Sequence, residues 1–303
     1  MDPDSFAALH DALDETDIFA SVTVKDGVII DEYYKPGYSS ESVFPLHSCS
    51  KSFTAVLLGL ALEQGYIDSI DDLASSYLPE ILEKDSARLK KVTLRHLLTH
   101  TSGISWDEAT SDSMFFDWYT SENWVDYVLS RPVTSEPGAR FNYSTGGTHL
   151  LAAIFQSAVG RTLFDFGREY LFDPLDMDSV RWGSDPQGIT DGGNGIRMNV
   201  YDMAKFGQLM LDGGMWQGEQ VIPADWVAEC TKIQVQRPAG YASYGYQFWV
   251  RSFAGYDCFF AQGFGGQLIF VCPSLDLVSV FTSNVSTHDP WGYFADYVLA
   301  AAE

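Results

Sequence analysis

The stretch Ser48-Cys49-Ser50-Lys51, which begins the segment SCSKSFTAVLLGLALEQ (residues 48–64), is the most informative part of this sequence. Apolar residues after it recur at the spacing of one helix face, and they are Phe53, Val56, Leu57, Leu60 and Ala61. We therefore predict a helix from about Ser48 to Gln64. On a helix, residues three apart share a face, so Lys51 lies beside Ser48. A serine hydroxyl needs an adjacent base to become a nucleophile, and this S-x-x-K spacing supplies an amine without using histidine.

Segments with the texture of strands lie at both ends of the chain. We predict strands at 19–24, 28–34, 244–251, 257–261, 267–271 and 277–283, the first two joined by an Asp26-Gly27 turn. Predicted helices cover 5–15, 70–77, 93–98, 121–130, 147–159, 163–171, 200–212, 223–232 and 290–301. This order indicates an α+β fold, in which an antiparallel sheet is flanked by terminal helices and carries an inserted helical domain. The expected domains are 1–66 with 243–303 for the sheet, and 67–242 for the mostly helical part.

Composition narrows the classes of function. The chain has 303 residues, 46% hydrophobic and 19% charged, which is typical of a globular protein. A net charge of −23 disfavours nucleic acid and anionic membranes as partners. We find no apolar run long enough to span a membrane and no signal peptide, so we expect a cytoplasmic location. The four cysteines form no C-x-x-C pair, and no metal or nucleotide motif occurs, so we expect no metal and no cofactor.

Further segments carry a resemblance to a known family. They are Thr93-Leu94-Arg95-His96-Leu97-Leu98-Thr99-His100-Thr101-Ser102-Gly103-Ile104, Pro137-Gly138-x-x-Phe141-x-Tyr143-Ser144, and Gly192-Gly193-Asn194-Gly195-Ile196-Arg197-Met198. Together with S-x-x-K, and in this order, they make the chain similar to the serine β-lactamase and penicillin-binding-protein superfamily. Within it, the sequence resembles class C-like serine hydrolases such as esterases, D-aminopeptidases and 6-aminohexanoate-dimer hydrolases. The resemblance implies a β-lactamase-like fold along nearly the whole chain.

The resemblance also implies roles for individual residues. Ser48 would be the nucleophile and Lys51 the base, while Tyr143 would take the serine proton or pass one to the leaving group. We expect the nearby Lys51 cation to lower the pKa of Tyr143. The backbone N–H groups of Ser48 and Phe264 would form the oxyanion hole. Thr145 stands where relatives often have asparagine.

The third motif departs from the family pattern, because Ala261-Gln262-Gly263 replaces the K-T-G of β-lactamases. The missing lysine normally attracts a substrate carboxylate, so we expect a small uncharged or cationic ester, amide or peptide substrate. Thr145, Gln262, Gly263, Trp106 and Trp249 are the candidate substrate-binding residues.

Several alternatives stay open at this stage. The chain is predicted to be a serine hydrolase that forms an acyl-enzyme. The first alternative is a β-lactamase or penicillin-binding DD-peptidase, and the second is a non-catalytic binding protein on the same fold. His96 and His100 are expected to have structural roles, since the mechanism needs no imidazole. The sequence does not indicate an oligomeric state.

Overall fold

The computed structural model describes residues 3–108, 112–284 and 290–302. Its centre is a seven-stranded antiparallel sheet with the strand order β2-β1-β12-β11-β10-β9-β8. The strands are β1 (Ile18–Lys25), β2 (Val28–Tyr34), β8 (Ser243–Tyr244), β9 (Trp249–Phe253), β10 (Tyr256–Gly263), β11 (Gln267–Cys272) and β12 (Leu277–Ser283). The N-terminal hairpin joins the C-terminal strands through β1 and β12, with Val22 opposite Val280. The predicted α+β fold with one antiparallel sheet is thus confirmed.

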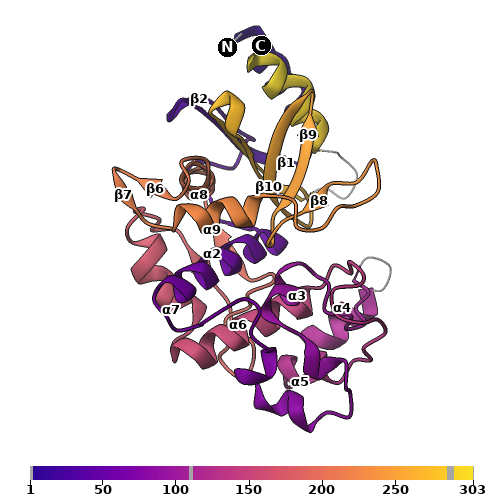
Figure 1. The fold of residues 1–303 in the computed structure, drawn as a ribbon. Helices are drawn as coiled ribbons and strands as arrows, with labels where there is room; N and C mark the ends of the chain where they lie inside the picture. The colour runs from indigo at the N-terminus through magenta and orange to yellow at the C-terminus, as the bar shows by residue number, and fades with distance from the viewer. Residues whose placement is uncertain (1–2, 109–111, 285–289, 303) are drawn as a thin grey trace.

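The two ends of the chain cover one face of this sheet. Helix α1 (Pro3–Asp14) packs against the C-terminal segment, which consists of α10 (Pro290–Tyr293), the π-helical η7 (Phe294–Leu299) and α11 (Ala300–Ala302). The first and last helices lie side by side at the top of Figure 1. Phe6, Leu9 and Leu13 form a buried cluster with Phe270 and Phe294. Apolar residues at helical spacing therefore account for this layer, as predicted.

The opposite face of the sheet is covered by helices from the middle of the chain. Helix α8 (Val200–Leu211) packs on β1, β11 and β12, whereas α2 (Ser50–Glu63) packs between α6 (Thr145–Val159), α9 (Ala224–Thr231) and β10. Every residue of α2 from Ser50 to Ala61 is buried. The indole of Trp226 on α9 donates a hydrogen bond to the Ala55 carbonyl. Helix α2 is thus the central helix of the molecule (Figure 1) and holds its first turn in a fixed place.

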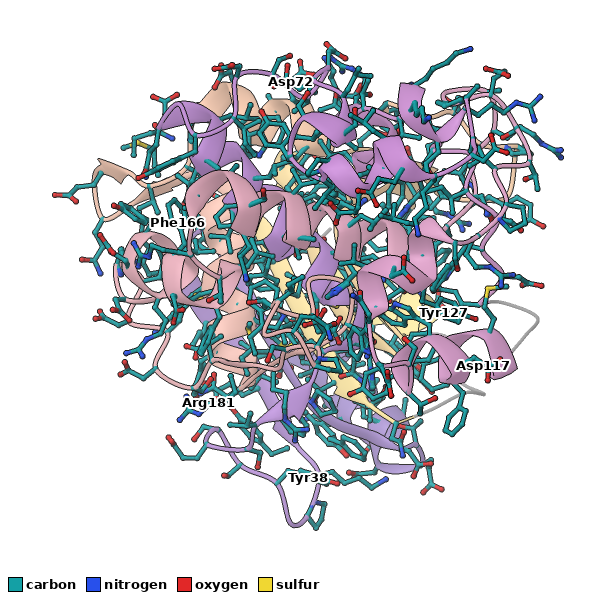
Figure 2. All side chains as sticks on the ribbon, turned by 90° about the horizontal axis from the view of Figure 1, so that it is seen from below. Tyr38, Asp72, Asp117, Tyr127, Phe166 and Arg181 are labelled. Atoms are coloured by element: carbon teal, nitrogen blue, oxygen red, sulfur yellow. The ribbon has the colours of Figure 1, made fainter. Side chains whose placement is uncertain are left out.

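The remaining elements are short. They are helices α3 (Leu94–Leu98), α4 (Asp112–Tyr119), α5 (Trp124–Leu129) and α7 (Leu163–Gly167), the π-helical η5 (Arg168–Phe172), the 3₁₀ turns η1 (His47–Cys49), η2 (Ala74–Ser76), η3 (Pro79–Glu83), η4 (Leu89–Lys91) and η6 (Pro273–Leu275), and strands β3 (Phe44–Pro45), β4 (Arg181–Trp182), β5 (Ile196–Met198), β6 (Met215–Trp216) and β7 (Glu219–Gln220). Seen from below (Figure 2), these helices lie in front of the sheet, and charged side chains such as Asp117 and Arg181 lie toward the edge.

One predicted element was wrong and one element was missed. Residues 70–77 form no α-helix beyond a 3₁₀ turn, and α4 was not predicted. The division into domains at 66 and 243 stays a prediction.

The predicted strand 244–251 is interrupted between β8 and β9, where Gln247 has a φ of +62°. Its buried carboxamide donates to the carbonyls of Leu97 and Leu98 and accepts a hydrogen bond from Thr148. An alternating apolar pattern cannot reveal such a break, because the residue that causes it is satisfied by partners about 100 and 150 positions away.

Candidate active site

Ser48 and Lys51 meet at the start of the central helix. Ser48 lies in the 3₁₀ turn η1, which continues directly into α2, so the turn and the helix together give the spacing that the sequence indicates. Lys51 Nζ is 2.8 Å from Ser48 Oγ, and the Lys51 side chain is 1% exposed. The pair is therefore close enough for direct proton transfer.

Lys51 has two further partners, and they restrict what its amine can do. Nζ lies 2.7 Å from the Gly193 carbonyl oxygen and 2.8 Å from Thr145 Oγ1. A neutral amine has two N–H groups and one lone pair. When the N–H groups are directed to Gly193 and Thr145, the lone pair faces Ser48. This is the geometry that a base for the Ser48 hydroxyl requires.

The charge of Lys51 is adjusted by its surroundings. Burial lowers the pKa of Lys51 from 10.5 to about 8, and the neighbouring carboxylates of Glu108 and Asp191 oppose part of that effect. A charged amine is costly to bury, so the neutral form gains. A sizeable fraction of Lys51 is therefore uncharged at mildly alkaline pH.

Tyr143 completes the group of three side chains. Its ring centroid is 4.9 Å from Lys51 Nζ, and its ring stacks on Trp249 with centroids 5.6 Å apart. Removal of water from the phenol raises the pKa of Tyr143 well above its usual value; Glu108 adds to this, while a hydrogen bond with Ser48 opposes it. The expected lowering of this pKa was wrong, because desolvation of the phenol is the largest effect and outweighs the opposing hydrogen bond with Ser48. Tyr143 is thus a phenol, which can donate a proton.

Sequence reasoning missed Glu108, which lies at the entrance to this group. Its Oε1 accepts a hydrogen bond from Thr145 Oγ1 at 2.9 Å, and its Oε2 accepts from Thr145 N at 3.1 Å and from Trp106 Nε1 at 2.6 Å. Thr145 is the first residue of α6, which Ser144 caps through its contact with Gly147 N. No local pattern marks Glu108, since its partner Thr145 is 37 positions away.

Gly193 was also missed as a functional residue, although its segment was recognised. A Cβ on Gly193 would lie 2.8 Å from the Thr145 carbonyl oxygen and 2.7 Å from its methyl group. Only glycine lets the backbone come this close to the start of α6. The close approach brings the Gly193 carbonyl to Lys51.

The inner edge of the site is formed by the end of β10. A Cβ on Gly263 would lie 2.0 Å from the Leu46 carbonyl oxygen, so β10 approaches the segment before Ser48 as closely as a backbone can. Phe264 follows in the turn between β10 and β11, and its side chain is 72% exposed. Gln262 is partly buried on β10. The two backbone N–H groups predicted to bind an oxyanion therefore belong to adjoining segments.

A cavity of about 490 Å³ opens onto Ser48. Its wall includes exposed or half-buried aromatic rings of α4, and its lining is His47, Ser48, Glu108, Phe115, Phe116, Tyr119, Thr145, Asn194 and Phe264. Trp106 and Trp249 were candidates for substrate binding. Trp106 is instead 3% exposed and lies against Glu108, while Trp249 lies against Tyr143. Both rings support the site from behind.

The histidines of the recognised segment have structural partners. His96 Nδ1 accepts a hydrogen bond from Thr93 N at 3.1 Å as part of a capping box at α3. His100 Nε2 is 3.0 Å from the Tyr244 hydroxyl, and burial lowers the pKa of His100 well below its usual value. A neutral, buried imidazole with such a partner positions its neighbours. These contacts agree with the structural roles that we expect.

Cys49, next to Ser48, is fully buried, with Sγ 3.5 Å from the Gln267 carbonyl oxygen. Burial raises the pKa of the Cys49 thiol, which makes it a poor nucleophile. In the described ranges, no three His, Cys, Asp or Glu side chains are grouped as ligands for a metal. Within those same ranges, no helix is both long and apolar enough to cross a membrane.

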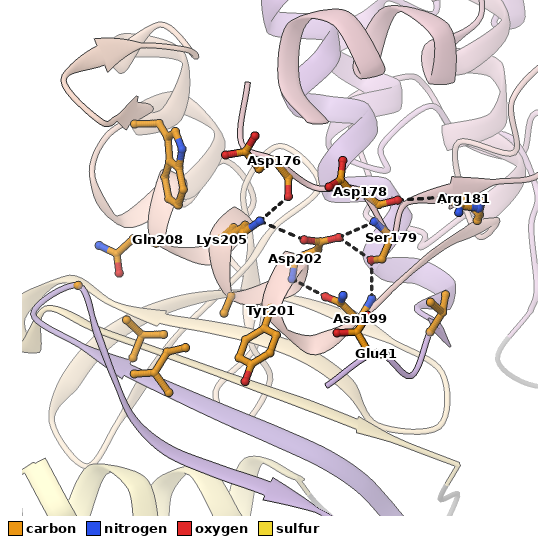
Figure 3. Close-up of a pocket in the computed structure, with 16 residues that line it drawn as sticks. Glu41, Asp176, Asp178, Ser179, Arg181, Asn199, Tyr201, Asp202, Lys205 and Gln208 are labelled. Atoms are coloured by element: carbon orange, nitrogen blue, oxygen red, sulfur yellow. Dashed lines mark hydrogen bonds and ion pairs between the residues drawn. The ribbon is translucent and has the colours of Figure 1, made fainter. Parts of the chain in front are cut away.

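A larger cleft of about 660 Å³ lies away from Ser48, between the β1–β2 hairpin and α8 (Figure 3). Its central carboxylate, Asp202, accepts hydrogen bonds from Ser179 N and Ser179 Oγ. The backbone N–H of Asp202 donates to Asn199 Oδ1, which caps α8. Lys205 Nζ lies 3.5 Å from Asp202 Oδ1, which makes them an ion pair. These polar groups form hydrogen bonds and an ion pair with one another at the first turn of α8, so their arrangement is accounted for without a bound ligand.

Comparisons with known proteins identify the family of this chain. The sequence matches the Beta-lactamase family over residues 6–303. It is 25% identical over 232 residues to the 6-aminohexanoate-dimer hydrolase of Paenarthrobacter ureafaciens, which covers 72% of this chain and 58% of that protein. This chain thus spans little more than half of that relative's length.

Two solved structures have the same fold. EstCE1, described as a hydrolase with promiscuous acyltransferase activity, matches with a TM-score of 0.83 at 17% identity, covering 99% of this chain and 98% of that one. A D-stereospecific amidohydrolase from Streptomyces sp. matches with a TM-score of 0.78 at 19% identity, covering 98% of each chain. With a family match along almost its whole length, this chain belongs to the Beta-lactamase family.

Proposed function

We propose that this protein is a serine hydrolase that cleaves an ester or amide through an acyl-enzyme. Neutral Lys51 takes the proton of Ser48 as Oγ attacks the substrate carbonyl. The backbone N–H groups of Ser48 and Phe264 hold the oxyanion. Tyr143 donates its phenol proton to the leaving group, and the proton held by Lys51 replaces it. In net terms one proton leaves Ser48 and one reaches the leaving group. Tyr143 is again a phenol, Lys51 is again a neutral amine, and the acyl group is bound to Ser48 Oγ.

Water completes the cycle. A water molecule attacks the Ser48 ester and gives up a proton to the restored base, and the acid leaves as Oγ regains a proton. The single observation that carries the proposal is the coordination of Lys51, since Gly193 and Thr145 occupy two directions of the amine and Ser48 occupies the third.

The site favours a neutral or cationic substrate. The cavity beside Ser48 contains the Glu108 carboxylate and several aromatic rings, and its inner strand has Ala261 where β-lactamases carry a lysine. A carboxylate-bearing substrate would meet a negative side chain and find no lysine on that strand. This makes an esterase or amidase a better fit than a β-lactamase or DD-peptidase.

The test is active-site labelling followed by a substrate panel. A fluorophosphonate probe should label wild-type protein at Ser48, located by mass spectrometry, and should not label Ser48→Ala. Exposed Ser39→Ala is a matched control that should label normally. Neutral p-nitrophenyl esters should be turned over faster than esters of the same length that carry a carboxylate. Faster turnover of the anionic esters, or of nitrocefin, would favour the β-lactamase alternative, and absence of labelling would favour a binding protein.

A further inference from the structure

A chain of hydrogen bonds runs from the solvent side of the site to the base. Glu108 Oε1 accepts from Thr145 Oγ1 at 2.9 Å, and Thr145 Oγ1 accepts from Lys51 Nζ at 2.8 Å. Thr145 has one hydroxyl proton, so what it donates to Glu108 it cannot donate to Lys51. We propose that Glu108 is a positioning residue, which holds the Thr145 hydroxyl as an acceptor toward Lys51 and thereby directs the amine's lone pair to Ser48. This inference rests on the proposed function.

The argument depends on what happens when the carboxylate is lost. A threonine hydroxyl that is free to rotate can donate its proton to a neutral amine, which is a strong acceptor. The lone pair of Lys51 would then face Thr145, and Ser48 would lose its base. The oxygens of Glu108 accept hydrogen bonds from Thr145 and Trp106, and as long as Oε1 takes the Thr145 hydroxyl proton this arrangement is excluded.

Glu108 is better suited to this role than to binding substrate. Three donors from Thr145 and Trp106 already contact its two oxygens. The Trp106 ring that supplies one of them is buried, so it fixes the carboxylate from behind. A group held at both oxygens is pre-organised for orienting a neighbour.

The same carboxylate acts on the charge of Lys51. The titratable groups that face Lys51 are Glu108, Asp191, Cys49, His47, His100 and Tyr143. Burial lowers the pKa of both histidines and raises the pKa of Cys49, so these groups are neutral near pH 7. Burial also raises the pKa of Asp191, so this carboxyl group is protonated more easily than a solvent-exposed one. Loss of the Glu108 charge should therefore lower the pKa of Lys51 further.

Glu108→Gln tests the proposal because it keeps the shape and reverses the hydrogen bond. If its carbonyl accepts from Trp106 and Thr145 N, its NH₂ faces Thr145 Oγ1 and forces that hydroxyl to donate elsewhere. We expect kcat/KM and the rate of fluorophosphonate labelling to fall about 10- to 100-fold, part of the usual contribution of a general base. The fall should lie in kcat rather than KM, and the acidic limb of the pH profile should move to lower pH.

Matched variants separate this role from a loss of folding or charge. Thr145→Val removes the hydroxyl and should behave like Glu108→Gln, whereas Thr145→Ser keeps the hydroxyl and should restore most of the labelling rate that Thr145→Val loses. The double variant Glu108→Gln/Thr145→Val should be labelled no more slowly than Thr145→Val alone, because both changes disrupt the same pair of hydrogen bonds from Glu108 through Thr145 to Lys51. Asp107→Asn removes an exposed neighbouring carboxylate and should leave the rate and the pH profile unchanged.

The outcomes distinguish the two proposals. If wild-type protein is not labelled at Ser48, the proposed function fails. If Ser48 is labelled but Glu108→Gln shows an unmoved acidic limb, or its loss adds fully to that of Thr145→Val, the positioning role is overturned. We expect each variant to unfold in a single two-state transition on heating, as monitored by circular dichroism. Its labelling rate then reports on the site and not on a loss of folding.

Discussion

The amine of Lys51 lies 2.7 Å from the carbonyl oxygen of Gly193, although 142 positions separate the two residues. This contact joins the central helix to the loop before β5. Because a carbonyl oxygen accepts hydrogen bonds and cannot donate one, an N–H group of the amine, and not its lone pair, points to Gly193. The base is therefore oriented by the backbone, and its protonation is controlled by burial.

Activity should rise with pH as Lys51 loses its proton. The pKa of Lys51 is lowered to about 8, so the amine is mostly charged below that value and mostly neutral above it. We expect kcat/KM for a neutral ester to increase through about pH 8 and then level off, as measured in buffers of constant ionic strength. A rate that stays flat between pH 6 and 9 would contradict a lysine base.

Lys51→Arg gives a second reading of the same group. A guanidinium keeps the cation but does not release a proton in this pH range, so labelling of Ser48 should fall by about 10² or more at every pH. Lys91→Arg, on an exposed lysine, is the control and should label like wild type. If labelling of Lys51→Arg recovered at high pH, that result would contradict the role of Lys51 as the base for Ser48.

Tyr143→Phe should separate esters from amides. The ring and its stacking on Trp249 remain, but the proton for the leaving group is lost. An amide nitrogen must be protonated to leave, whereas p-nitrophenolate leaves as an anion. We expect turnover of an amide to fall by about 10²–10⁴ and that of the matched p-nitrophenyl ester to fall far less. Equal losses on both substrates would indicate that Tyr143 acts before the leaving group departs.

The sequence pattern predicts the structural features that are determined by residues close together in the chain. Helix α2, the hairpin of β1 and β2, and the spacing of Ser48 and Lys51 follow from periodicity and turn residues, and the structure has them. Glu108 is one of 41 acidic residues, and only its distant contact with Thr145 gives it a role. The direction of the Tyr143 pKa was mistaken because burial cannot be judged from the chain alone. The family segments narrowed the search, but they did not include the carboxylate that completes the site.

Gly263→Ala should damage the oxyanion hole. The added methyl group would lie 2.0 Å from the Leu46 carbonyl oxygen, which belongs to the backbone and cannot turn away. Strand β10 must then shift from the turn that carries Ser48, and the N–H of Phe264 would shift with it. We expect kcat to fall about 10²–10³-fold, the loss typical of removing one donor. Gly183→Ala adds a methyl group with nothing within 4 Å and should leave kcat unchanged.

The buried amine should also cost stability, in a way that depends on pH. The folded pKa of Lys51, about 8, lies below the unfolded value of 10.5, so between these values the unfolded chain binds more protons and stability rises with pH. Lys51→Met removes this dependence. The free energy of unfolding of the variant minus that of wild type should therefore decrease by about 2 kcal/mol between pH 7 and 9.5. Urea denaturation at each pH measures this difference, and a constant difference would mean that Lys51 is not desolvated.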